Sequence, residues 1–459
     1  MPLKGSTLIE LTNVKTGEVE RYRDDNMITD ALSMIMKPIG YQKGYGAMND
    51  ANNICVTFMG GLVLFDTAIE EKGSTCYAPG EAGAVGYAAY QHTNTTTDNT
   101  LGSCNLTETE LNTSGRYMKM VFEFSTAQAN GNINSVCLTH PDAAKYAMYG
   151  SPTNTQASQT FYYMHNGWSG HAILSDSAQK KETAFSILAE HPFLVDADDD
   201  AVYYFSVPDP SIIRITKRRG NLLSVPVVVA HKSNKALIET FDINLPAAIN
   251  TTYVAWNFEV DEDCLYICTA TGTTIASKGT MKVARIYLDD RRSEYFEVVN
   301  NTGVALESNS NFFAYIHQGL VYVKTSGNVV YTINLTDPTD WTKLSGTLKT
   351  SSCRPVAAQN GRVMYFYYSY ANYGTDSSYL SIANGKRKMV ETPTANGMHS
   401  CGSGVYYRQY IPYRDGFHWA GPSNCCYIKN YIATINNLSR TIEKTSDKTM
   451  KITYTIQEV

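Results

Sequence analysis

The stretch Gln318-Gly319-Leu320-Val321-Tyr322 places a tight polar turn directly before an aliphatic-aromatic strand. Similar stretches recur along the chain, in Asp199-Asp200-Ala201-Val202-Tyr203, Glu262-Asp263-Cys264-Leu265-Tyr266, Asn360-Gly361-Arg362-Val363-Met364 and, more loosely, Ser403-Gly404-Val405-Tyr406-Tyr407. Asn- and Gly-containing pairs suit hairpin turns with positive φ, and the residues after them suit a buried strand. Successive copies lie about 40 to 65 residues apart, which is the spacing of four-stranded propeller blades.

The copy at 318–322 also has the neighbours that a blade requires. Short apolar segments at 312–316, 320–323 and 329–333 form a three-strand meander, and Trp341 stands where a fourth, outer strand is expected. A single blade cannot bury its own faces, so the stable arrangement stacks blades around an axis. We therefore predict an inserted β-propeller-like display domain over 191–430, with about five or six blades.

The composition indicates a mainly β-structured protein of more than one domain. A chain of 459 residues exceeds one ordinary hydrophobic core, and only 18% of its residues are charged while 33 are Tyr. The net charge of −5 and the pI near 6.0 argue against a nucleic-acid partner, which selects a basic face. Apolar runs stay short of the ~18 residues of a membrane span, so we expect no membrane insertion.

The two ends of the chain carry a different pattern from the repeats. Residues 7–11 and 18–22 alternate apolar and polar side chains around a turn, which predicts a hairpin, and 27–36 have the spacing of one short helix ending before Pro38. The strands that follow predict a β-sandwich virion-attachment domain over 1–150, built from both chain ends and completed by a returning C-terminal hairpin at 431–459. Residues 151–190 are either a connector or the first blade.

Three segments outside the repeats resemble virion proteins of tailed bacteriophages that infect Gram-positive gut bacteria. They are 9–19 running on to 26–32, then 122–131 with 133–135, and finally 433–438 with 444–445 and 450–455. The resemblance implies a tail fibre, a minor tail protein or a receptor-binding protein of the particle. It implies a virion location, with assembly in the bacterial host cytoplasm, and it carries over no catalytic residue.

The chemical motifs of enzymes and metal sites are incomplete in this sequence. Asp196, Asp198 and Asp200 resemble the start of a calcium loop, but Ala201 replaces the required Gly and Val207 the bidentate Glu. The Asp-box turn of sialidase propellers is absent, the histidines lack metal spacing, and the cysteines read as buried thiols. We expect no metal, no cofactor and no enzymatic activity; a polysaccharide depolymerase would need two carboxylates across a sugar site.

Two aromatic segments are the candidates for ligand binding. Aromatic rings stack on sugars or anchor protein contacts, while Arg hydrogen-bonds hydroxyl groups. The candidate residues are Tyr407, Arg408, Tyr410, Tyr413, Arg414 and Trp419 in one segment, and Tyr368, Tyr370 and Tyr373 in the other. The alternative interpretation is that these rings close the last blade, with Arg stacked on Tyr inside it.

Together these observations predict a structural and adhesion component of a tailed phage particle. Its partners would be other virion proteins, further copies of itself in a trimer or ring, and a host cell-surface carbohydrate or protein. Two alternatives stay open. One is a purely structural fibre, collar or head-decoration protein without receptor binding, and the other is a polysaccharide depolymerase built on a propeller.

Overall fold

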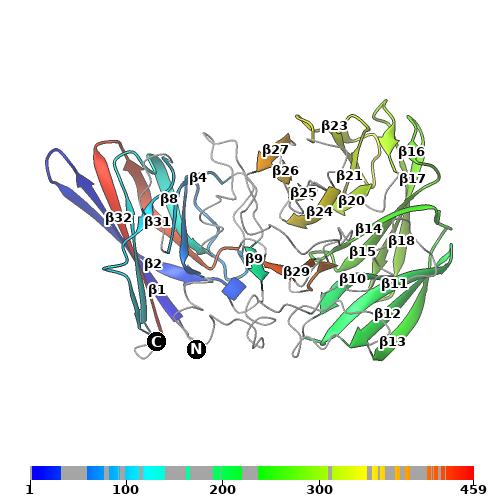
Figure 1. The fold of residues 1–459 in the computed structure, drawn as a ribbon, viewed down its shortest axis with the longest axis horizontal. Coiled ribbons are helices and arrows are strands. Elements are labelled where there is room, and N and C mark those ends of the chain that lie inside the picture. Colours follow the sequence, from blue (N-terminus) through cyan, green and yellow to red (C-terminus); the bar gives the residue numbers. More distant parts are fainter. Residues whose placement is uncertain are drawn as a thin grey trace. The chain divides into compact units, whose positions relative to one another are not determined.

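A computed structural model gives the fold of most of the chain (Figure 1). It describes residues 3–32, 59–76, 82–90, 93, 99–112, 117–139, 162–165, 190–196, 198–219, 236–308, 313–348, 354–359, 362–366, 378–382, 388–392, 411–414, 416, 418–421, 425–428 and 431–458. The chain divides into two compact units. One, the terminal barrel, contains Met1–Met36, Tyr45–Tyr162 and Lys429–Val459; the other, the propeller, contains Lys37–Gly44 and Tyr163–Ile428.

The terminal barrel is one ten-stranded sheet in the order β4-β3-β8-β31-β2-β1-β32-β7-β5, with β6 also paired to β7. Its strands are β1 Leu3–Asn13, β2 Val19–Ile28, β3 Gly61–Phe65, β4 Ala84–Ala89, β5 Ser103–Cys104, β6 Glu110–Asn112, β7 Tyr117–Phe124, β8 Gly131–Thr139, β31 Thr434–Lys444 and β32 Lys448–Glu458. The sheet curls until its ends meet, because Tyr87 of β4 bridges to Leu101 just before β5. The expected sandwich thus takes the form of a nearly closed barrel.

Both chain ends lie in the middle of this sheet. Strand β1 pairs with β32 from Leu3 opposite Glu458 to Asn13 opposite Lys448. Strand β31 pairs with β8, with Thr434 opposite Leu138. Burial alternates along β32, where Met450, Ile452, Tyr454 and Ile456 are buried and their neighbours are partly exposed. This period of two gives the barrel one apolar inner face.

The helix expected over 27–36 does not begin where its spacing predicts. Met27 and Ile28 belong to β2 and pair with Ile435 and Thr434 of β31. The Thr29 backbone N–H then donates to the Ala433 carbonyl at 3.0 Å. Long-range strand pairing overrides the local helical spacing here. Residues 31–32 have helical geometry, and 33–36 lie outside the described residues.

The propeller contains five four-stranded sheets among the described residues. With the innermost strand first, blade 1 contains β10 His191–Asp196, β11 Ala201–Asp209, β12 Ile212–Arg219 and β13 Leu237–Asn244, and blade 2 contains β14 Tyr253–Glu259, β15 Cys264–Ala270, β17 Thr280–Tyr287 and β18 Ser293–Val299. Blade 3 contains β20 Ala314–His317, β21 Leu320–Lys324, β22 Val330–Asn334 and β23 Trp341–Lys343, and blade 4 contains β24 Arg354–Gln359, β25 Arg362–Phe366, β26 Ser378–Ile382 and β27 Lys388–Thr392. Blade 5 contains β28 Ile411–Pro412, β29 His418–Gly421, β30 Cys425–Ile428 and β9 Tyr162–His165. A two-stranded ribbon, β16 Thr274–Ile275 with β19 Leu306–Glu307, accompanies them.

Neighbouring blades meet through their first strands. The Phe193 ring of β10 lies 5.7 Å from the Phe258 ring of β14. Strand β14 in turn contacts β20, and β20 contacts β24. Val195 of β10 forms a parallel bridge with Tyr413, directly after β28. The all-β fold with a propeller-like domain, predicted from the recurring turn-plus-strand stretches, is confirmed, and the blade strands expected around 318–322 and Trp341 are present.

Blade 5 is completed by a strand from far earlier in the sequence. Strands β28, β29 and β30 lie near the end of the propeller segment, whereas β9 is Tyr162–His165. The fourth position of the last blade is therefore filled by the first strand of the propeller. Such an overlap gives blade 5 four strands like the other blades, so β30 is not left as an unpaired edge.

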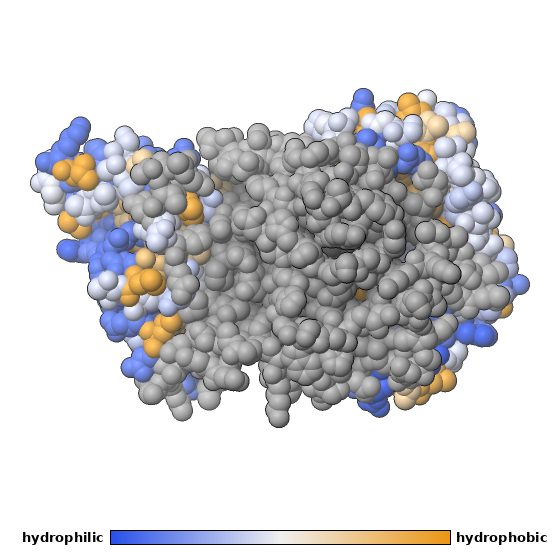
Figure 2. All heavy atoms as spheres, in the orientation of Figure 1, coloured by the Kyte–Doolittle hydropathy of each residue, from blue (hydrophilic) through white to orange (hydrophobic). Residues whose placement is uncertain are grey.

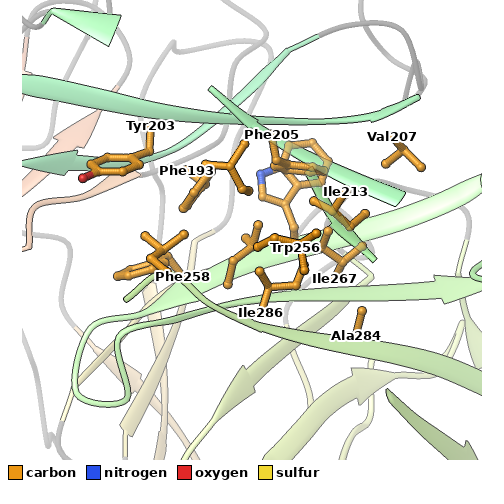
Figure 3. Packing of buried hydrophobic residues seen from close by; sticks show 14 of the residues in the cluster. Phe193, Tyr203, Phe205, Val207, Ile213, Trp256, Phe258, Ile267, Ala284 and Ile286 are labelled. Atoms are coloured by element: carbon orange, nitrogen blue, oxygen red, sulfur yellow. The ribbon is translucent and has the colours of Figure 1, made fainter. Parts of the chain in front are cut away.

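The interface between blades 1 and 2 is a continuous apolar core (Figure 3). Phe193 and Phe205 from blade 1 pack against Trp256 and Phe258 from blade 2. Ile267 of β15 and Ile286 of β17 extend the same cluster across the sheet of blade 2. A second cluster joins blade 2 to blade 3 through residues such as Met281, Val283, Val321 and Ile333. Blade 2 thus buries its two faces against blades 1 and 3, as the repeat architecture requires.

Candidate functional site at the inner strands of the propeller

The recurring turns place polar side chains at one end of the inner strands. Strands β10, β14 and β20 end at Asp196, Glu259 and His317. The turns that follow contain residues in the left-handed region, with φ of 47° at Asp200, 48° at Asp263 and 48° at Gln318. This backbone conformation favours the Asp of the turns at Asp200 and Asp263 and the Gly319 that follows Gln318, whereas Gln318 itself adopts it without such a preference.

Arg414 connects three of these blades. It directly follows Tyr413, and its backbone N–H donates to the Val195 carbonyl of blade 1 at 2.8 Å. Its guanidinium lies 3.0 Å from Asp196 of blade 1 and 2.6 Å from Asp263 of blade 2, and over the Tyr203 ring at 5.7 Å. Arg414, Asp196 and Asp263 are hereafter called the arginine clamp.

The electrostatics of the clamp keep its arginine charged. Burial lowers the pKa of the Arg414 guanidinium, but the charges of Asp263 and Asp196 outweigh it and leave that pKa above its usual value. For Asp263 the balance is reversed, because burial raises the pKa of its carboxyl more than Arg414 lowers it. The neighbouring carboxyl of Asp289 adds to this rise. The Asp263 carboxyl thus gains a proton at a higher pH than an ordinary aspartate, because its pKa is raised.

A second polar contact joins blades 2 and 3 around the ring. His317 Nδ1 lies 2.7 Å from a carboxylate oxygen of Glu259, and both side chains are buried. Two residues earlier, the Asn257 side chain donates to the Ile316 carbonyl and accepts from the Ile316 N–H, each at 2.8 Å. The Asn257 side chain therefore links blade 2 to blade 3 through the same pair of backbone groups that a neighbouring strand would use, although the two blades share no sheet.

The remaining charges at this end of blade 1 are also paired. The Asp199 N–H donates to Asp196 at 3.1 Å, and the Asp199 carboxylate forms an ion pair with Lys217. Lys217 keeps the pKa of the Asp199 carboxyl below its usual value. The Lys217 ammonium also lies 5.2 Å from the centre of the Tyr203 ring. The acidic run that resembles a calcium loop is therefore occupied by cationic side chains of the same chain.

The contacts of Arg414 with Asp196 and Asp263, and of His317 with Glu259, are suited to holding neighbouring blades together. Within the described part of the chain, no group of three or more His, Cys, Asp or Glu side chains has the geometry of a metal site. The described cysteines are buried free thiols, at 76, 104, 137, 264 and 268. Burial raises the pKa of the Cys76 thiol to about 11, which keeps it protonated and unreactive at neutral pH.

The structure places only part of the predicted ligand-binding set. Tyr413 is 1% exposed, so its ring does not offer a face to an external ligand, and Arg414 is engaged by two aspartates. For these two residues the geometry follows the alternative interpretation, in which they close the last blade. Trp419 lies in β29, opposite Pro412 and Tyr427. The other candidates, Tyr407, Arg408, Tyr410, Tyr368, Tyr370 and Tyr373, lie outside the described residues.

Sequence reasoning did not find the partners of Arg414. Asp196 stands out only as a false calcium ligand, and Asp263 only as a turn residue. A signal for Asp196 exists, because the inner strands of blades 1 to 4 each end on a polar residue shortly before the turn: Asp196, Glu259, His317 and Gln359. The inner strands of neighbouring blades are adjacent, so the side chains at their ends can meet. A polar residue that recurs at this position from blade to blade therefore indicates contacts between blades.

The described surface does not mark a single docking face. Figure 2 shows apolar and hydrophilic residues interspersed in the coloured regions at either side of the view. Among the described residues the exposed large apolar side chains are Val14, Val19, Leu106, Leu237, Ile238, Val304 and Trp341. Val14 and Val19 flank one barrel hairpin and Leu237 and Ile238 are adjacent in β13, while the other three are far apart in the sequence. Scattered exposed apolar residues are ordinary in soluble proteins.

Comparison with known proteins found solved structures with some similarity in fold, but no match in sequence. No protein-family model matches the chain, and no curated protein matches it. The β-propeller domain of the Trilobed protease from Pyrococcus furiosus aligns at 9% identity and a TM-score of 0.24, over 64% of this chain and 72% of that one. A GH43 glycoside hydrolase, engineered to show both endo-xylanase and exo-arabinofuranosidase activity, aligns at 15% identity and 0.28, over 64% and 56%.

A third similar structure is the computationally designed Ika8 protein, at 8% identity and a TM-score of 0.25, over 80% of this chain and 99% of that one. These neighbours include hydrolases as well as a designed protein. Their identities and TM-scores are too low to support an argument about activity, so the description of this chain as a barrel with an inserted propeller rests on its own sheets.

Proposed function

We propose that this chain is a structural and adhesion component of a tailed bacteriophage particle, with the terminal barrel as its attachment domain and the propeller as its displayed module. The proposal extends to the partners expected from the sequence: other virion proteins, further copies of the chain, and a host surface glycan or protein. The protein acts by binding, without catalysis.

One observation carries the proposal. The segments that resemble phage virion proteins fall on β1, β2, β7, β8, β31 and β32. These strands are far apart in sequence, yet they are six consecutive strands of the barrel, in the order β8-β31-β2-β1-β32-β7. The resemblance therefore coincides with one folded surface, and it excludes the propeller.

The connectivity supports a division of labour between the two units. The chain leaves the barrel after β8 and returns at β31, and these strands are neighbours, with Thr434 opposite Leu138. An insertion between paired strands leaves the sheet intact whatever it contains, so a propeller of different specificity fits the same barrel. A constant attachment domain with an exchangeable module suits a protein that meets variable host surfaces.

Particle association is the first test. Antibodies raised against the purified full-length chain are used to probe density-purified phage particles by blotting and immunogold microscopy. We expect the chain to sediment with the particles and the label to sit at one fixed position on them. Recovery of the chain only in the soluble fraction of infected cells, with unlabelled particles, contradicts the proposal.

Adhesion is tested separately with the full-length chain on intact host cells and on a glycan array. Tyr407→Ala and Tyr410→Ala probe the predicted aromatic patch, and Trp341→Ala, on the outer strand of blade 3, is the matched control. Loss of cell binding in the first two alone supports a receptor site. Particle association without cell binding favours the purely structural alternative, and shortened capsule chains after incubation favour the depolymerase.

A further inference from the structure

A polar cluster crosses the interior of the terminal barrel. The Thr434 and Tyr454 hydroxyl groups are hydrogen-bonded, although their strands, β31 and β32, are separated in the sheet by β2 and β1. A contact between strands that are not neighbours passes through the barrel, so these side chains point inward. Thr7 of β1 belongs to the same inner face, where its hydroxyl donates to the side-chain amide oxygen (Oδ1) of Asn26 at 2.8 Å.

Two asparagines face each other in this interior. Strand β2 pairs with β31 through Met27 opposite Ile435 and Ile28 opposite Thr434. One further step along the same register places Asn26 opposite Asn436, where the pairing ends. On its other side Asn26 lies opposite Gly5 of β1. A Cβ atom at Gly5 would sit 2.9 Å from the Asn26 Cβ and 3.1 Å from its Nδ2, so the glycine leaves the space that the amide occupies.

These amides have unmet hydrogen-bonding capacity. Asn436 is 0% exposed, and neither its Nδ2 nor its Oδ1 has a hydrogen-bond partner among the described residues. The Asn26 Nδ2 is buried and likewise unpartnered in that part of the chain. Exchanging the O and N positions of Asn436 does not help, since both atoms lack partners. Each unsatisfied buried polar atom costs about 1–3 kcal/mol, so three of them in one place would weaken the sheet considerably.

We propose that the barrel interior between β2 and β31 is a binding site for ordered water, held by Asn26 and Asn436. The unmet groups comprise amide donors and one carbonyl acceptor, and water is the small ligand that accepts and donates together. An uncharged site that offers both donors and an acceptor fits a water molecule better than a cation or an anion. Buried water makes about three hydrogen bonds on average, which matches the three atoms present.

The site lies at one of the two shortest ladders of the barrel, the other being the two pairs between β5 and β7. Strands β1 and β32 share eleven residue pairs and β1 and β2 share eight, whereas β2 and β31 share two. Strand β31 carries the return from the propeller, and β2 begins the run β2-β1-β32-β7. Water bridging Asn26 to Asn436 continues the connection between these strands where direct pairing stops.

Replacing Asn436 with Leu tests the proposal through the sign of the stability change. With water bound, Asn436→Leu strips the water of its partners, and we expect the full-length chain to melt roughly 2–4 °C lower. If the amide is truly unsatisfied, Leu removes a buried polar group and the Tm rises, which overturns the proposal. Asn300→Leu in the propeller is the matched control and must lower the Tm, since Asn300 is 0% exposed and its Nδ2 donates to three carbonyls.

A crystal structure of the unmodified full-length chain, at a resolution that orders solvent, gives a test that does not depend on a variant folding. We expect a water molecule within hydrogen-bond distance of both the Asn26 and the Asn436 side chains. Direct contact of the two amides with each other, or with protein groups that satisfy them, overturns the proposal.

Discussion

The terminal barrel and the propeller each bring together segments that are far apart in the sequence, but by different means. In the barrel the chain ends meet through backbone pairing, as β1 and β32 run side by side from Leu3 and Glu458 to Asn13 and Lys448. In the propeller the five sheets share few backbone bonds, and their contact depends on side chains. Phe193 and Phe258 pack between blades 1 and 2, and Arg414 reaches from blade 5 to Asp196 and Asp263.

The difference teaches where each unit tolerates change. Backbone ladders are insensitive to the identity of exposed side chains, so the barrel depends on its alternating inner face. The propeller depends on particular side chains at blade interfaces and on backbone conformation in its hairpins. Single substitutions should therefore separate the two units, and the following four are ordered from the largest expected effect to the smallest.

The largest effect is expected from truncating an interface ring. Phe193→Ala removes a side chain that is 1% exposed and that packs on Phe205 and Phe258 (Figure 3), which costs about 3–5 kcal/mol. Native-state hydrogen exchange of the full-length chain should show lost protection in blades 1 and 2 and unchanged protection in the barrel. Phe122→Ala, in the barrel interior, is the reciprocal control. Equal loss of protection in both units after either change would show that the two units unfold as one.

A buried lysine gives the barrel a distinctive pH dependence. Lys444 is 1% exposed and donates to the Ser125 carbonyl and the Asn130 side chain, and burial lowers its pKa to about 8. The unfolded chain binds this proton up to about pH 10.4, so folding stability rises with pH between those values. Relative to Lys444→Met, the natural chain should gain about 2–3 kcal/mol from pH 8 to pH 10.4, at about 1.4 kcal/mol for each pKa unit.

Denaturant unfolding of the two proteins across this pH range measures that gain. Lys448→Met is the control of opposite sign, because hydrogen bonding to Glu20 raises the pKa of the Lys448 ammonium, and its stabilisation is lost as pH rises. A parallel pH dependence of the natural chain and Lys444→Met would mean that the lysine stays charged in the fold.

Removing the centre of the arginine clamp tests the side-chain closure of the propeller. Arg414→Met leaves Asp196 and Asp263 without their counter-charge, and we expect a loss of about 2 kcal/mol, since the pair is only partly shielded from solvent. The loss should shrink at acidic pH, where Asp263 takes up a proton early. Arg214→Met breaks an exposed two-point pair with Asp242 within blade 1 and should cost under about 1 kcal/mol. Equal effects of the two substitutions would reduce the clamp to a surface ion pair.

Sequence patterns predicted the elements whose signals are local and missed those that depend on distant partners. The turn before Leu320 and the strand after it predicted blade 3, because turn chemistry and strand periodicity act over a few residues. The predicted start of the helix at Met27 is wrong, since Met27 and Ile28 pair with β31, about 400 residues away in the sequence. Tyr413 and Arg414 stood out as aromatic and cationic, but only the fold of blades 1 and 2 gives Arg414 its aspartate partners.

The smallest predicted effect isolates the backbone conformation that the recurring turns share. Gln318 is exposed, with φ of 48°, so a change there acts mainly through the main chain. A β-branched residue is strained in this region, and Gln318→Val should lower the unfolding free energy by about 1 kcal/mol, while Gln318→Asn should be nearly neutral. Lys15→Val, in an exposed barrel turn outside the left-handed region, should cost little. If urea unfolding gives Gln318→Val and Lys15→Val the same small effect, the left-handed conformation at Gln318 does not restrict which side chain fits that turn.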